Sequence, residues 1–146
     1  MGDEQVDATP YLTHAGLREE TAGWGLNALI GERGLNLSGG QRARVTLARA
    51  LARQAPLLVL DDALSSVDAE TESRILDTLG ALSASDDDQT LLMITHRFAR
   101  LHSFDQVLVL EDGVLAQHGT PARVAAGPGL YRKMLELQQM ESALGI

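Results

Sequence analysis

LSGGQRARVTLARALARQAPLLVLDDALSSVD, residues 37–68, is the stretch that decides the fold of this chain. Ser38 is a good N-cap, so a helix is predicted to begin there, to run to about Gln54 and to stop before Pro56. Residues 57–61, LLVLD, form an apolar run that ends in a carboxylate, which is typical of a strand buried on both faces of a parallel sheet. A helix, a strand and an acidic strand end in this order indicate an α/β fold.

The residues after this stretch continue the alternation of helices and strands. Asp68 is predicted to cap a helix whose apolar stripe is formed by Ile75, Leu76, Leu79 and Leu82, with a polar loop at 83–89. Residues 90–95, TLLMIT, are predicted to be a second buried strand, which ends at His96.

The rest of the chain is predicted to contain a strand pair, short helices and a glycine-rich loop. Residues 106–119 are predicted to form two strands joined by a turn at Asp112-Gly113. Thr120 and Pro121 are predicted to start a short helix, and a last amphipathic helix is expected from about Leu130 to Leu144. Before residue 37, a weak helix near residues 11–17, ended by Gly23 and Gly25, precedes a glycine-rich loop at 26–37.

Composition narrows the possible function classes. The 146 residues are enough for one domain with a core and too few to favour two. A net charge of −8 argues against nucleic-acid binding and against docking on an anionic membrane surface. The chain has no cysteine, so it forms no disulfide or thiolate metal site. No apolar run approaches the ~20 residues of a membrane helix, and the acidic N-terminus is unlike a signal peptide, so direct membrane insertion is not expected.

Three places carry residues suited to phosphate or metal chemistry. Ser38-Gly39-Gly40 lies at a predicted helix N-terminus, where free N–H groups and the helix dipole favour an anion; the alternative is an exposed basic helix with a glycine-rich entry. Asp61 and Asp62 end a strand, where carboxylates can hold Mg²⁺ or orient a water, although acids at strand ends are often only solvated. His96 ends the next strand and could lie at the same sheet edge, or be structural.

Other polar and apolar groups have simpler interpretations. His14, His102 and His118 are predicted to be surface residues, and the acidic cluster Asp86 to Asp88 is predicted to be a solvated loop. The stripe of the last helix is predicted to serve packing; it consists of Leu130, Met134, Leu137 and Leu144.

Taken in order, these segments resemble the nucleotide-binding domain of ABC transporters. Leu37 to Gln41 matches the signature motif of that family, Leu57 to Asp61 resembles its Walker B strand, Ala63 to Asp68 its D-loop, and His96 its switch histidine. Gly31-Glu32-Arg33-Gly34 resembles the X-loop of exporters. The resemblance implies a partial P-loop NTPase-like domain with a mostly parallel sheet and flanking helices. Within it, about 1–56 corresponds to a helical subdomain remnant, 57–119 to the sheet portion and 120–146 to C-terminal helices.

The resemblance also implies a division of roles. In this family two domains enclose two ATP molecules, and each ATP is held by one domain's Walker motifs and the other's signature. The implied nucleotide-binding residues are Ser38, Gly39, Gly40, Gln41 and Asp68, with Asp61 for Mg²⁺ and Asp62 and His96 for hydrolysis. The implied partners are a second ABC ATPase domain, in a homo- or heterodimer, and an exporter's transmembrane domain that contacts Gly31–Gly34. The implied location is the cytoplasmic face of a membrane.

Two departures from the family pattern weaken the expected activity. The only lysine is Lys133 and no GxxxxGK occurs, so the Walker A loop, the Q-loop and the first half of the domain are expected to be absent. Asp62 stands where hydrolytically competent members usually have Glu. Asp is shorter by one methylene, so an attacking water would be misplaced, and a shift of that order can cost ~100-fold in rate. Similar substitutions mark the degenerate site of heterodimeric exporters. The isolated chain is therefore expected to be a poor ATPase, with an uncovered strand face and a tendency to self-associate.

Two alternatives to an exporter's ATP-binding domain follow from the same residues. The chain could be a non-catalytic module that donates its signature face to a partner ATPase or regulates that partner. It could also belong to a soluble ABC ATPase outside transport, such as a chromosome-maintenance or translation ATPase. GERG at 31–34 and His96 weigh against the chromosome-maintenance group, and GERG weighs less firmly against the translation group.

Overall fold

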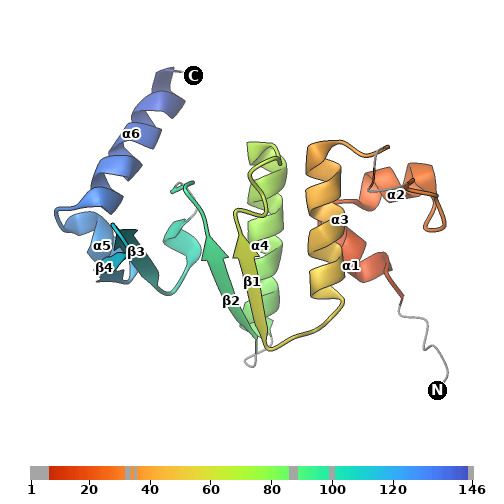
Figure 1. The fold of residues 1–146 in the computed structure, drawn as a ribbon, viewed down its shortest axis with the longest axis horizontal. Helices are drawn as coiled ribbons and strands as arrows, with labels where there is room; N and C mark the ends of the chain where they lie inside the picture. Colours follow the sequence, from red (N-terminus) through yellow and green to blue (C-terminus); the bar gives the residue numbers. More distant parts are fainter. Residues whose placement is uncertain (1–6, 32–33, 35, 86–88, 99–100, 145–146) are drawn as a thin grey trace. The chain divides into compact units, whose positions relative to one another are not determined.

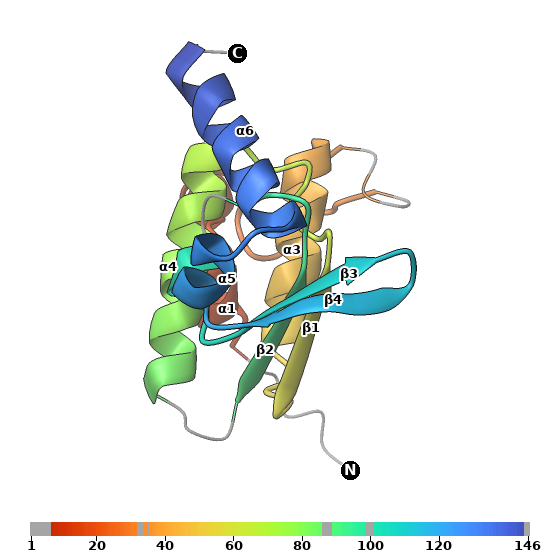
Figure 2. The same ribbon diagram turned by 90° about the vertical axis from the view of Figure 1, so that its left-hand side faces the viewer.

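The computed structural model describes residues 7–31, 34, 36–85, 89–98 and 101–144. The chain divides into two compact units, Met1–Ile94 and Thr95–Ile146. Figures 1 and 2 show the elements of each unit. The predicted α/β class is confirmed, because both units combine helices with strands.

The first unit is a parallel pair of strands covered by helices. The strands are β1 (Leu57–Asp61) and β2 (Thr90–Ile94), and Leu58 pairs with Leu91 and Asp61 with Ile94. The helices are α1 (Thr9–His14), α2 (Arg18–Trp24), α3 (Gly39–Leu51) and α4 (Ala69–Ser85). Because β1 and β2 run in parallel, their carboxyl ends lie at the same edge of this sheet.

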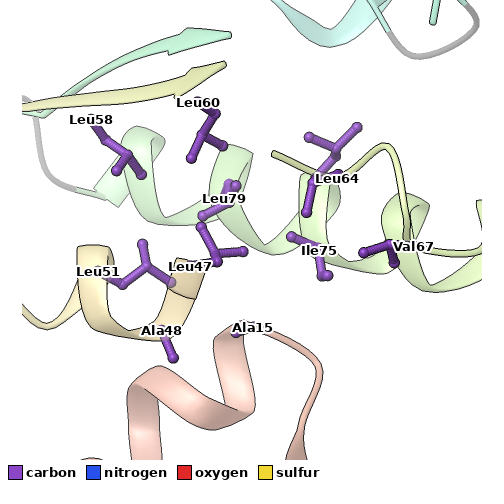
Figure 3. Close-up of a cluster of buried hydrophobic side chains, with 11 residues drawn as sticks. Ala15, Leu47, Ala48, Leu51, Leu58, Leu60, Leu64, Val67, Ile75 and Leu79 are labelled. Atoms are coloured by element: carbon purple, nitrogen blue, oxygen red, sulfur yellow. The ribbon is translucent and has the colours of Figure 1, made fainter. Parts of the chain in front are cut away.

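The core of this unit lies between the strands and the helices. Leu58 and Leu60 point from β1 toward Leu47 of α3 and Leu79 of α4, and all four side chains are buried (Figure 3). Ile75 of α4 is only 1% exposed. Burial of such side chains stabilises the fold by about 1.5–3 kcal/mol each, so this cluster holds β1 against α3 and α4.

The prediction that β1 is buried on both faces is wrong. Its side chains alternate, and Leu57 and Val59 are 53% and 49% exposed. On β2, Leu92 and Ile94 are 43% and 51% exposed. Strand side chains point alternately to the two faces, and the helices of this unit cover only one of them. The uncovered apolar strand face that was expected is therefore confirmed.

The helix boundaries follow local backbone chemistry. One weak helix was expected before residue 24, but there are two, separated at Gly16, whose φ of 71° interrupts the helical conformation. The cap at Ser38 is confirmed. Helix α3 ends at Leu51, three residues earlier than predicted, and Gln54 has a left-handed φ of 47°. Helix α4 continues to Ser85, into the loop predicted at 83–89.

The second unit is a hairpin packed against helices. It contains the 3-10 helix η2 (Leu101–Ser103), the strands β3 (Val107–Glu111) and β4 (Val114–Gly119), and the helices α5 (Pro121–Ala126) and α6 (Leu130–Leu144). Asp112 and Gly113 have φ angles of 49° and 79°, as a type I′ turn requires, so the predicted hairpin is confirmed. Its core is formed by Val107, Val109, Val124 and Tyr131.

The expectation of one mostly parallel sheet needs correction. Among the residues that the structure describes, β1 and β2 pair parallel, whereas β3 and β4 pair antiparallel in a sheet of their own. A turn of two residues can join only antiparallel strands, so the Asp112-Gly113 turn dictates this pairing. Among the described residues, no helix is both long and apolar enough to cross a membrane.

Candidate functional site

The Ser38–Gln41 turn opens α3 through a reciprocal cap. The Gln41 N–H donates to Ser38 Oγ over 3.1 Å, and the Ser38 N–H donates to Gln41 Oε1 over 2.9 Å. Helix geometry leaves the N–H groups of Gly39 and Gly40 without an intrahelical acceptor. Ser38 and Gly39 are exposed, so the predicted anion site is accessible from solvent.

The guanidinium of Arg42 adds positive charge to this turn. Its Nη1 donates to the Leu37 carbonyl oxygen over 2.8 Å. Its Nη2 lies 4.0 Å from the position that a Cβ atom on Gly39 would occupy. The helix N-terminus and this cation therefore favour an anion at the same place.

The Asp62–Asp68 loop packs directly against the turn. A Cβ atom on Gly40 would lie 2.9 Å from the Ser66 carbonyl oxygen, and one on Gly39 would lie 3.6 Å from Ser66 Cβ. Gly40 thus allows a close approach between two backbones. The structure brings the predicted Ser38–Gln41 residues together with the loop that ends in Asp68.

Asp61 and Asp62 lie at the carboxyl end of β1, and both are exposed. The Asp62 N–H donates to the Ile94 carbonyl oxygen over 2.9 Å, and its own carbonyl accepts from the Ser65 N–H over 3.2 Å. Asp62 has a φ of 47°, a left-handed conformation that Asp adopts more readily than most residues. No pattern in the sequence signals this turn.

The donor set at this strand end fits a hard cation. Exposed carboxylates bind Mg²⁺ together with waters and phosphate oxygens rather than in an all-protein cage. Within the part of the chain that the structure describes, no cluster of three or more His, Cys, Asp or Glu side chains could hold a metal alone. Asp61 therefore fits a cation only if a phosphate ligand supplies further oxygens.

Asp68 is confirmed as the cap of α4. Its Oδ1 accepts the Thr71 N–H over 2.9 Å. Hydrogen bonds from the Thr71 backbone and side chain lower the pKa of Asp68 below its usual 3.8, and the nearby charge of Arg44 lowers it further. Asp68 is therefore an anion at neutral pH.

Arg44 is an important residue that sequence reasoning did not single out. Its guanidinium donates to the Gly16 carbonyl oxygen and to Glu20 Oε1, and its side chain is only 12% exposed. It fastens the start of α2 to α3. Its partners lie 28 and 24 residues away in sequence, so no local pattern signals the contact.

His96 lies in the second unit, two residues after β2 ends. The segment around it is held by the Arg97 N–H, which donates to Thr95 Oγ1 over 3.0 Å, and by the Phe98 N–H, which donates to Gln138 Oε1 over 2.9 Å. Its own side chain is exposed. The proximity of His96 to Asp61 and Asp62 stays a prediction.

The remaining predictions have mixed outcomes. His102 and His118 are exposed as predicted, whereas His14 is half-buried. Leu137 and Leu144 are 54% and 73% exposed, so the packing role predicted for them is wrong; α6 packs through Tyr131 and its neighbours instead. Glu32, Arg33 and Asp86 to Asp88 lie outside the described residues.

Comparisons with known proteins show which family this chain is similar to. Residues 4–65 match the family described as ABC transporter. An ATP-dependent lipid A-core flippase of Haemophilus ducreyi is 39% identical over 137 residues, covering 94% of this chain and 23% of the relative. The flippase of Salmonella paratyphi A is 41% identical over 114 residues, which cover 78% of this chain and 19% of the relative. The chain thus spans about a fifth of the length of these curated relatives.

A solved structure shares both sequence and fold. It is described as a bacterial Atm1-family ABC exporter with ATP bound. The likeness has a TM-score of 0.82 at 33% sequence identity and covers 94% of this chain and 24% of that one.

Proposed function

Because the chain belongs to the ATP-binding domains of exporter-type ABC transporters, we propose that it couples ATP binding and hydrolysis to export across a membrane. The observation that carries this proposal is the exposed, capped Ser38–Gln41 turn, held against the Asp62–Asp68 loop. We propose that about 1–56 forms part of a helical subdomain, 57–119 the sheet portion and 120–146 the C-terminal helices. The transported substrate would be chosen outside these residues.

In this proposal the Ser38–Gln41 turn completes the ATP site of a second ATP-binding domain. The Ser38 oxygen and the Gln41 amide oxygen are already acceptors in the cap. The phosphate would therefore meet the N–H groups of Gly39 and Gly40 and the hydroxyl hydrogen of Ser38. Gln41 would act by holding Ser38, and Asp68 by fixing the loop beside the turn.

The chain's own site would use the strand end. Asp61 would bind Mg²⁺ together with phosphate oxygens, and Asp62 would orient the attacking water. His96 would stabilise the charge that develops on the transferred phosphate. Asp62 is one methylene shorter than Glu, so hydrolysis here would be slower by up to about 100-fold.

The proposed partners follow from the same assignment. One is a second ATP-binding domain, of the same or a different chain. The other is an exporter's transmembrane domain, which would contact the segment Gly31–Gly34 and hold the chain at the cytoplasmic face of a membrane. No nucleic-acid partner is proposed, because the net charge is −8.

A chimera tests the proposal in a complete protein. The residues of the Haemophilus ducreyi flippase that match this chain would be replaced by this chain, and MgATP hydrolysis measured. Ser38→Arg, which places a bulky cation in the turn, should lower the rate at least tenfold. His96→Ala should also lower it, whereas Asp62→Glu should raise it. The matched control is Gln139→Arg, at an exposed position of α6. Full activity of the Ser38→Arg chimera would contradict the proposal.

A second candidate function is a non-catalytic module that stimulates a complete partner ATPase. It is favoured by the capped Ser38–Gln41 turn, whose Ser38 and Gly39 are exposed and so accessible to a second ATPase. The purified chain would be added to a relative's ATP-binding domain that has its own Walker A loop. A rise in hydrolysis that Ser38→Arg removes supports this candidate, and no rise refutes it.

A further inference from the structure

The segment that carries His96 is held from the C-terminal helix. Phe98, two residues after His96, donates its N–H to Gln138 Oε1 of α6 over 2.9 Å. The Phe98 ring meets the ring of Tyr131, also on α6, edge to face, with centroids 5.7 Å apart and an interplanar angle of 70°. One polar and one aromatic contact thus fix both the backbone and the side chain of Phe98 to the same helix.

The two contacts differ in burial and so in what they contribute. Tyr131 is only 2% exposed and belongs to the core of the second unit, so it anchors α6 to the hairpin. Gln138 lies two turns later, where its neighbours Leu137, Gln139 and Met140 are exposed. Packing does not explain a half-buried amide at such a position, but its hydrogen bond to Phe98 does.

We infer that Gln138 is a positioning residue, which sets the backbone of residues 96–98 and hence the place of the His96 imidazole. This inference rests on the role proposed for His96 in ATP hydrolysis. Gln138 touches neither nucleotide nor metal in this assignment. It fixes a short segment in which the Arg97 N–H also donates to Thr95 Oγ1.

Amide hydrogen exchange of the full chain tests the contact directly. Gln138→Leu removes the acceptor and should make the Phe98 amide exchange roughly fivefold faster. Gln138→Glu retains an acceptor oxygen and should preserve protection. Gln139→Leu is the matched control on the exposed neighbour and should change nothing. An unchanged Phe98 rate in Gln138→Leu, or an equal rise at Val109 and Tyr131, would overturn the inference.

The imidazole itself supplies a second readout without nucleotide or partner. In NMR spectra the ring signal of His96 should move in Gln138→Leu and return in Gln138→Glu, while the signal of His14 in the other unit stays fixed. If Gln138→Leu does not fold, the unaltered chain decides the question. A nuclear Overhauser effect between the Phe98 amide and the Gln138 side chain is expected, and its absence refutes the contact.

Kinetics in the flippase chimera separate this inference from the proposed function. Gln138→Leu should lower kcat by roughly fivefold or less, with KM for MgATP unchanged. Added to His96→Ala, it should have no further effect, because the two substitutions act on one element. If the losses in kcat from the two substitutions are additive, Gln138 does not act through His96 and the inference is overturned. A chimera indifferent to His96→Ala would instead refute the proposed function, whatever the NMR result.

Discussion

Gly40 and Ser66 approach so closely that a Cβ atom on Gly40 would lie 2.9 Å from the Ser66 carbonyl oxygen. Gly40→Ala therefore forces the turn and the Asp62–Asp68 loop apart. We expect it to lower the free energy of unfolding by about 1–3 kcal/mol, despite the better helix propensity of Ala. Gly39→Ala meets only an ordinary contact of 3.6 Å and should be neutral or slightly stabilising. Urea denaturation of both variants measures the difference, and equal effects would contradict the close approach.

The ion pair between Arg44 and Glu20 should contribute measurably to stability. Its side chains are only 12% and 22% exposed, so removal of one partner leaves the other poorly solvated. Glu20→Gln is expected to lower the free energy of unfolding by roughly 1–2 kcal/mol, less than for a fully buried pair. The pair Arg132–Glu136, at 53% and 52% exposure, is the control, and Glu136→Gln should cost under about 0.5 kcal/mol. Similar losses in both variants would be inconsistent with this reasoning.

Acid should weaken the cap at Asp68. The folded-state pKa of Asp68 is lowered below 3.8, so the unfolded chain binds its proton at higher pH than the folded chain does. Stability from this group is complete above the unfolded pKa and is lost as pH falls through the folded pKa. Asp68→Asn retains a capping oxygen but does not titrate. Denaturation curves from about pH 6 to 2 should show a shallower acid loss in Asp68→Asn than in the unaltered chain.

The exposed face of β1 and β2 should promote self-association. Leu57, Val59, Leu92 and Ile94 are each exposed by 43–53% on one side of this sheet. The double substitution Val59→Thr and Leu92→Thr leaves β-branched residues, which suit a strand, at both positions while removing apolar surface. Sedimentation velocity should show less association in the double variant. Leu137→Thr, at an exposed position of the other unit, is the control. A strictly monomeric unaltered chain at high concentration would refute this prediction.

Local patterns predicted the elements well. The cap at Ser38, the Asp112-Gly113 turn and the start of α5 at Pro121 after Thr120 each depend on neighbouring residues, so the sequence was sufficient for them. The break at Gly16 was missed because a single glycine inside a weak apolar pattern does not distinguish one helix from two.

Contacts between distant segments could not be predicted in this way. The bonds of Arg44 to Gly16 and Glu20, and of Phe98 to Gln138, span 24–40 residues and depend on how whole elements pack. The exposure of Val59 was missed for a related reason. A continuous apolar run places apolar side chains on both faces of a strand, and only the packing of other elements shows which face is covered. The candidate residues could be named from sequence, but the contacts that hold them could not.

The left-handed backbone at Asp62 bears on how this site could change over evolutionary time. Asp and Asn occupy a φ near 47° more readily than residues with longer side chains. In the hydrolytic role proposed for Asp62, a change to Glu would therefore add reach toward a water while adding conformational strain at the same residue. Gains in turnover at this position would tend to come with a loss of stability, which a second substitution elsewhere would have to offset. The order in which such substitutions become tolerable is then set by the backbone at residue 62 rather than by the chemistry of the carboxylate alone.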